Sequence, residues 1–90
     1  MFAAEGDGER GAEGAGWTDA DRQLLARFGS NVRRHRKEQG RSIAALANEA
    51  GLDASYLGEL ERGRKNVSLL TAARISLALD ILVQALLEER

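Results

Sequence analysis

Basic side chains gather in two short stretches of this sequence, and the chemistry they offer is phosphate binding. Five positive charges fall within nine positions, at Arg33, Arg34, Arg36, Lys37 and Arg41, and a second group follows at Arg62, Arg64 and Lys65. Guanidinium and ammonium groups supply the phosphate contacts on which binding to nucleic acids depends. A charge run alone is more often the solvated face of a helix. The two stretches therefore make nucleic acid a candidate partner and no more.

The sequence shows none of the residue arrangements that most catalytic and metal chemistry requires. The sequence has no cysteine and a single histidine, His35, with no clustered acids near it, so disulfides and metal sites are not expected. No nucleophile–base arrangement or phosphate-binding loop is visible. We expect no enzyme activity, no cofactor and no metal, and no small-molecule ligand is evident.

The net charge of −1 is unevenly distributed. Residues 1–22 carry two arginines against six acidic residues, a net charge of −4, which leaves +3 on residues 23–90. Residues 1–16 hold five glycines and four acidic residues, and nothing after Phe2 is large enough to anchor a core. We predict a flexible acidic tail over residues 1–16 and one folded domain over residues 17–90.

We expect no signal for secretion or membrane insertion in this chain. Its first residues lack a basic region followed by an apolar run. The longest apolar-rich stretch, Ile75 to Leu87, is interrupted by polar residues and is too short to cross a bilayer. We expect a cytoplasmic protein with no membrane partner.

Glycines and capping residues divide the folded part into five predicted helices. Thr18 and Asp21 have capping-box spacing, so the first helix should begin at Asp19 and stop before Gly40. The other helices are predicted over residues 43–50, 54–62, 69–79 and 82–89, the last without a good capping residue. No segment has the alternating pattern of a strand. The fold class is therefore all-α.

The second and third predicted helices have the features of a helix-turn-helix. Gly51 stands between them, where the turn requires a positive φ. Ala47 is small where the following helix must cross closely. The apolar contacts between the two helices and the core come from Leu46, Ala50, Leu52, Leu57 and Leu60.

On these residues the sequence resembles the phage Cro and repressor (XRE-type) helix-turn-helix family, over about Leu25 to Leu87. The matching residues are Phe28-Gly29, Val32-Arg33, Arg36-Lys37, Gly40, Ser42, Leu46-Ala47, Ala50-Gly51-Leu52, Tyr56-Leu57, Leu60-Glu61-Arg62-Gly63, Asn66, Ser68-Leu69 and Ala78-Leu79. Within the family it looks most like restriction–modification controller proteins and small stand-alone regulators. The resemblance implies a five-helix lambda-repressor-like domain that binds double-stranded DNA as a homodimer, with helix 54–62 in the major groove, and so a sequence-specific transcriptional regulator.

The resemblance also implies roles for individual residues. Base edges would face Ala54, Ser55, Gly58 and Glu59. Phosphates would contact Arg41, Ser42, Arg64, Lys65 and Asn66. Arg36 and Glu61 would form a partly buried ion pair that holds the fold together. Ile43 departs from the family, which often has a glutamine there that binds phosphate.

The last predicted helix is apolar nearly all round, so one domain of this size cannot bury all of it. We assign the apolar side chains that the core cannot bury to a homodimer interface that includes Leu82, Val83, Leu86 and Leu87. An alternative function stays open: with Ile43 and a weakly polar recognition face, the chain could be a protein-interaction module that keeps the fold without operator binding.

Overall fold

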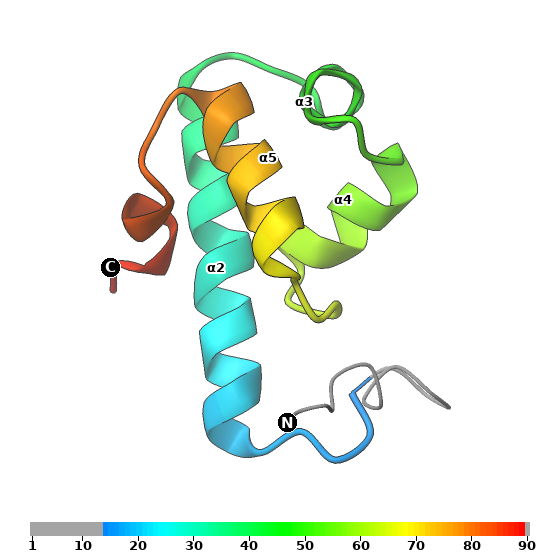
Figure 1. Ribbon diagram of the computed structural model, residues 1–90, viewed down its shortest axis with the longest axis vertical. Helices are drawn as coiled ribbons and strands as arrows, with labels where there is room; N and C mark the ends of the chain where they lie inside the picture. The colour runs from blue at the N-terminus through cyan, green and yellow to red at the C-terminus, as the bar shows by residue number, and fades with distance from the viewer. Residues whose placement is uncertain (1–13, 90) are drawn as a thin grey trace.

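The computed structural model describes residues 14–89, which form four α-helices followed by a 3-10 helix (Figure 1). The elements are α2 (Asp19–Glu38), α3 (Ile43–Ala50), α4 (Ala54–Glu61), α5 (Leu69–Leu79) and η1 (Val83–Leu87). The described residues contain no strand, in agreement with the predicted all-α class. The tail expected over residues 1–16 lies outside the described residues, apart from its last three positions.

Each α-helix begins at a side chain that accepts a hydrogen bond from a backbone amide of the first turn. The Asp21 amide donates to Oγ1 of Thr18 at 3.0 Å, and the Thr18 amide donates to the Asp21 carboxylate at 2.9 Å, which is the predicted capping box. Ser42, Asp53 and Ser68 cap α3, α4 and α5. First-turn amides have no partner within a helix, so these caps stabilise the helix starts. The predicted starts are confirmed.

Helices α3 and α5 each end at a residue whose backbone has a left-handed conformation. Gly51, with φ of 73°, ends α3, and Asp80, with φ of 59°, ends α5, as predicted. The end of α4 falls at Glu61, one residue earlier than predicted, because Arg62 is already the C-cap and Gly63 turns the chain with φ of 76°.

The predicted last α-helix over residues 82–89 is wrong in type and extent. The segment forms the short 3-10 helix η1, and Leu82 before it makes no capping bond. The buried Asn31 side chain of α2 donates Nδ2–H to the carbonyls of Leu86 at 3.0 Å and Glu88 at 2.8 Å. These carbonyls are thereby bonded to α2, which holds the segment against that helix in place of a further α-helical turn.

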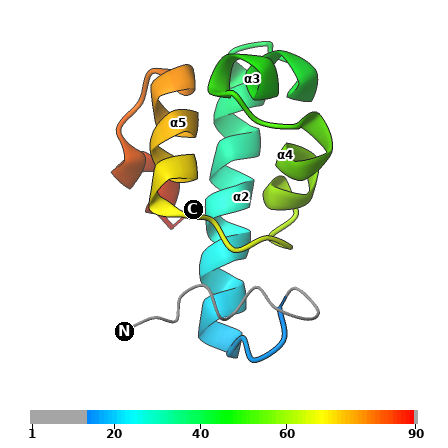
Figure 2. The ribbon, with the colours of Figure 1, turned by 45° about the vertical axis from the view of Figure 1, so that its right-hand side comes forward.

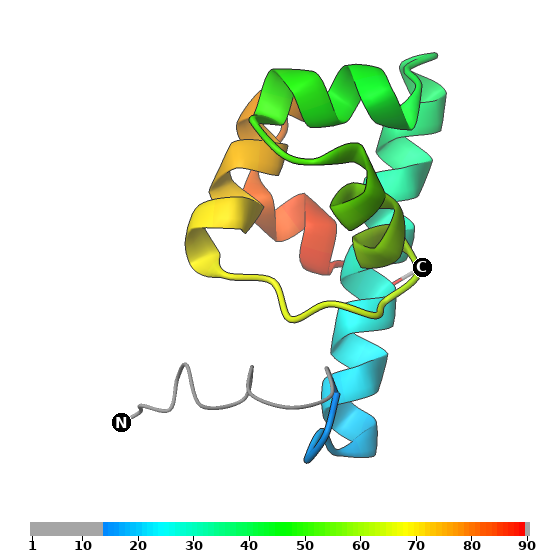
Figure 3. The same cartoon turned by 90° about the vertical axis from the view of Figure 1, so that its right-hand side faces the viewer.

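The long helix α2 is the centre of the bundle, and its first turns extend beyond the other helices (Figures 1 and 3). η1 and α4 pack on α2, while α5 packs on α3 and η1 (Figure 2). The elements share one apolar core, formed by Phe28, Val32, Leu46, Ala47, Ala50, Leu57, Leu60, Ala72, Ile75, Leu79 and Leu86.

The end of α4 approaches α2 so closely that only glycine fits at two positions. A Cβ atom on Gly29 of α2 would lie 2.3 Å from the carbonyl oxygen of Leu60. A Cβ atom on Gly63 would lie 2.9 Å from Cα of Ala26. Both neighbours are backbone atoms, which cannot move aside as a flexible side chain can. This close contact fixes where α4 leaves the bundle.

Within residues 14–89, no helix is both long enough and apolar enough to cross a membrane.

Candidate nucleic-acid interface

α3 and α4 are joined by a tight turn and lie on the side of the bundle that faces the viewer in Figure 3. The turn passes through Gly51 and is closed by the Leu52 amide, which donates to the Ala47 carbonyl at 2.8 Å. Ala47 and Leu46 are buried beneath the crossing. The predicted helix-turn-helix is therefore present, with the small residue at the crossing point and the glycine in the left-handed turn.

The outer face of α4 is short and polar. Leu57 and Leu60 point into the core, which leaves Ala54 and Ser55 exposed at the start of the helix. These two predicted base-facing residues share one accessible surface. The Asp53 cap before them orients the helix start, since its carboxylate accepts from the Tyr56 amide at 3.1 Å.

Gly58 does not fit the prediction that it faces a DNA base. It is buried, with Ile43 of α3 beside it at 4.0 Å and Nη1 of Arg62 at 3.7 Å from the position of its missing Cβ. Ile43, the residue that departs from the family pattern, is half-buried and packs against the core. Gly58 therefore belongs to the contact between the two helices.

The Glu59 carboxylate, also predicted to face bases, is bonded to two arginines. Oε2 accepts from Nη1 of Arg62 and Oε1 from Nη1 of Arg64, each at 3.3 Å. The three side chains form a cluster at the end of α4, which we call the Glu59 cluster. Sequence reasoning missed it, although the three-residue spacing of Glu59 and Arg62 was available as a signal.

The predicted phosphate contacts are not all alike in the structure. Ser42 is exposed at the start of α3, where its Oγ accepts from the Ala45 amide at 3.0 Å. The start of α3 therefore presents further amides to solvent. Arg64, Lys65 and Asn66 follow one another in the loop between α4 and α5, with Arg64 and Asn66 exposed and Lys65 half-buried.

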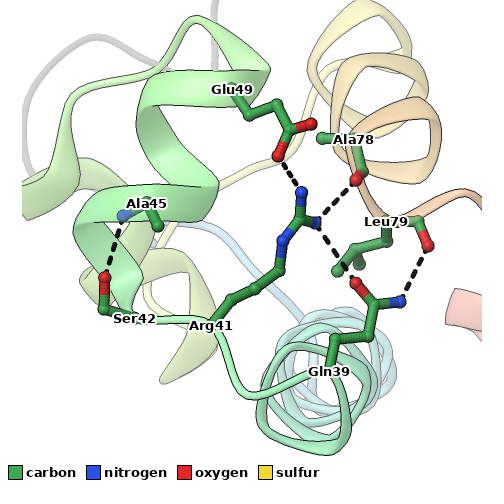
Figure 4. Close-up of polar contacts among 7 residues, drawn as sticks. All are labelled: Gln39, Arg41, Ser42, Ala45, Glu49, Ala78 and Leu79. Carbon is green, nitrogen blue, oxygen red and sulfur yellow. Dashed lines mark hydrogen bonds and ion pairs between the residues drawn. The ribbon is translucent and has the colours of Figure 1, made fainter.

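Arg41 differs from its predicted role as a phosphate contact. Its guanidinium donates from Nη1 to the Ala78 carbonyl at 2.6 Å and to Oε1 of Gln39 at 3.2 Å, and pairs with Glu49 through Nη2 (Figure 4). Gln39 in turn donates to the Leu79 carbonyl at 2.8 Å. Carbonyls at the end of α5 lack partners within the helix, and these two side chains satisfy them. Arg41 thus fastens α3 and the loop before it to α5.

Arg36 and Glu61 form the predicted ion pair. Nε of Arg36 lies 2.7 Å from Oε2 of Glu61, Nη2 lies 3.0 Å from Oε1, and both side chains are buried. The third guanidinium nitrogen, Nη1, donates to the Arg41 carbonyl at 2.9 Å. The hydrogen bond to Glu61 raises the pKa of Arg36 above its ordinary value. The pair connects α2 to the last residue of the recognition helix α4.

The predicted dimer residues divide into exposed and buried ones. Leu82 is 70% exposed, Leu87 45% and Val83 37%, whereas Leu86 is fully buried in the core. The inclusion of Leu86 in an interface is therefore wrong: η1 turns that side chain inward against α2. Val83 and Leu87 line an apolar groove of about 330 Å³ together with residues of α2, α5 and the loop before it.

Three or more metal-ligating side chains do not come together anywhere in residues 14–89. His35 is half-buried, with Nδ1 4.0 Å from the Glu38 carboxylate of the same helix. Within the described residues His35 is therefore not part of a recognisable metal cluster.

Several known proteins are similar to this chain in sequence. A family model described as helix-turn-helix matches residues 32–86. The HTH-type transcriptional regulator SinR of Bacillus subtilis is 38% identical over 64 residues, which make up 70% of this chain and 58% of SinR. The control protein C.MunI of Mycoplasma sp is 34% identical over 67 residues, or 73% of this chain and 90% of C.MunI. The chain therefore spans less than two thirds of SinR and most of C.MunI.

The fold is also similar to that of a solved relative. The restriction-modification controller protein C.AhdI from Aeromonas hydrophila matches with a TM-score of 0.67 and 44% sequence identity, over 69% of this chain and 94% of C.AhdI. The match of the family model to more than half of the chain and the likeness to C.MunI confirm the resemblance drawn from Leu46-Ala47, Ala50-Gly51-Leu52 and the residues around them. The chain belongs to the XRE-type helix-turn-helix family.

Proposed function

We propose that this chain is a cytoplasmic, sequence-specific DNA-binding transcriptional regulator that acts as a homodimer, with α4 in the major groove. The observation that carries the proposal is the exposed start of α4, where Ala54 and Ser55 face outward while Leu57 and Leu60 fix the helix to the core. A recognition helix contacts base edges with its N-terminal residues. SinR, by its description a transcriptional regulator, supports the same role.

Direct reading of bases rests on few side chains. The Ser55 hydroxyl can donate to or accept from several bases, and the Ala54 methyl can contact a thymine methyl group. Both side chains are small and uncharged, so they add little affinity. Phosphate contacts and the shape of the DNA then account for most of the binding.

Phosphate contacts would come from two places that flank α4. Ser42 and the first amides of α3 form one, and Arg64, Lys65 and Asn66 form the other. Arg41 is bonded to Ala78 and Glu49, so it would hold the start of α3 in position without contacting a phosphate itself. Each phosphate contact releases condensed counterions, so binding should weaken steeply as salt is added.

Two copies would join through the exposed apolar residues of the C-terminal segment. Leu82, Val83 and Leu87 are available for such a contact, and the groove beside them extends it onto α2 and α5. A two-fold dimer presents two copies of α4 to successive turns of DNA. The operator would then be a palindrome with half-sites about 10 base pairs apart.

The test is selection of bound fragments from random DNA, followed by a salt titration of binding to the selected duplex. We expect a palindromic site and a log–log salt slope that corresponds to several phosphate contacts. Affinity that is indifferent to both salt and sequence would contradict the proposal and favour a protein-interaction module.

A further inference from the structure

The Glu59 cluster lies in the region that the proposed function turns toward DNA. Glu59 lies on α4, Arg62 is the C-cap of that helix, and Arg64 lies two residues further. The amides of Arg62 and Arg64 both donate to the Glu59 carbonyl at 3.1 Å. Backbone and side chain of Glu59 thus hold the same two residues, which fixes the cluster to the end of the recognition helix.

The cluster changes the charge that this surface presents. Two guanidinium groups and one carboxylate give a net charge of +1, where the arginines alone would give +2. The arginine side chains are 57% and 64% exposed, so their other N–H groups are open to solvent. Each bond to Glu59 uses one of the five donors of a guanidinium. The arginines are therefore restrained and partly neutralised.

A base-reading role for Glu59 conflicts with these contacts. A carboxylate that accepts from a cytosine amino group must direct an oxygen toward the base. Both oxygens of Glu59 already accept from arginines on the same surface. An uncompensated carboxylate close to phosphates would also be repelled.

We propose that Glu59 determines specificity without contacting a base. By holding Arg62 and Arg64, it lowers the affinity of the domain for DNA of arbitrary sequence, and so raises the ratio of operator binding to non-specific binding. The proposal rests on the proposed function. It predicts that loss of the carboxylate raises the charge of the cluster from +1 to +2, so that the two arginines together can make one more contact with any phosphate.

The test is the substitution Glu59→Gln, with binding to the selected operator and to a random duplex measured over a range of salt. Glu59→Gln should strengthen binding to the random duplex up to about eightfold at about 0.1 M salt, since one more phosphate contact adds about 0.9 to the log–log slope. The operator should gain less, because in the proposed operator complex Arg64 already contacts a phosphate, so the specificity ratio falls. Glu38→Gln is the matched control, because it removes one carboxylate from an exposed position on α2 and should change neither affinity.

A second comparison separates restraint of the arginines from a general effect of charge. In an Arg62→Gln/Arg64→Gln background, Glu59→Gln relieves only the repulsion between the carboxylate and the phosphates, so it should strengthen binding to random DNA less than it does in the unmodified protein; an equal or larger gain there overturns the proposal. A loss of operator affinity with unchanged random binding would also overturn it and make Glu59 a base reader. If the unmodified protein shows no salt-dependent DNA binding, the proposed function itself fails, and this inference fails with it.

Discussion

The guanidinium of Arg36 in α2 donates two buried hydrogen bonds, of 2.7 Å and 3.0 Å, to the carboxylate of Glu61 at the end of α4. Glu61 follows directly after the core residue Leu60, so the pair fixes the end of α4 and the loop with Arg64 and Lys65. Because the pKa of Arg36 is raised further above its ordinary value, the pair should persist as pH rises through neutrality. As the pH rises, its contribution to stability would be lost only in strong alkali.

Removal of one partner of this pair should be costly. Glu61→Ala leaves the buried Arg36 without its counter-charge and should lower the free energy of unfolding by about 3–5 kcal/mol. Urea unfolding followed by circular dichroism measures the change. Glu38→Ala, in which the lost carboxylate is exposed, should cost less than about 1 kcal/mol. Equal effects of the two substitutions would contradict the structural role of the pair.

Two helical glycines should respond in opposite ways to alanine. Gly29→Ala places a methyl group against the Leu60 carbonyl and should destabilise the fold by about 3 kcal/mol. Gly58→Ala meets only ordinary contacts, the nearest at 3.7 Å, and should stabilise α4 by about 0.5–1 kcal/mol. Thermal unfolding compares the two variants. A tolerated Gly29→Ala would mean that α2 and α4 are further apart than described.

Arg41 should stabilise the packing of α3 against α5 and should not contact a phosphate. Arg41→Gln loses the bonds to Ala78 and Glu49 and should lower the free energy of unfolding by about 1.5–3 kcal/mol. The salt slope of DNA binding should stay the same. Lys65→Gln should do the reverse, with stability retained and the slope lower by about 0.9. A reduced slope in Arg41→Gln would restore the expectation that Arg41 contacts a phosphate.

The apolar C-terminal residues should separate into interface and core. Leu82→Ser with Leu87→Ser should dissociate the proposed dimer without unfolding it, because both side chains are exposed. Leu86→Ala should instead cost about 2–5 kcal/mol of stability. Sedimentation velocity and urea unfolding distinguish the two results. Leu77→Ser, at an 80% exposed position on α5, is the control; dissociation by that substitution alone would move the interface to α5.

The helix starts and the turn at Gly51 were predictable because their causes are local. A capping side chain and the amide it binds are three residues apart, and a left-handed turn depends on the residue in it. The family resemblance placed the Arg36–Glu61 pair correctly, although its partners are 25 positions apart.

The features that sequence reasoning missed depend on contacts between distant segments. Asn31 binds the Leu86 carbonyl of η1 across 55 positions, and no local pattern shows that bond. Arg41 donates a hydrogen bond to the Ala78 carbonyl at the end of α5, 37 positions away. An α-helical wheel places Leu86 in the interface, but the segment is a 3-10 helix, in which side chains repeat every three residues.

The central claim, that α4 carries the DNA-facing surface, is tested most directly by an NMR titration of the isotope-labelled protein with the selected duplex. We predict that the amide signals of Ala54, Ser55 and Glu59 shift most, together with those at the start of α3, and that one protomer binds each half-site. Shifts confined to α5 and η1, with α4 unaffected at saturation, would contradict it.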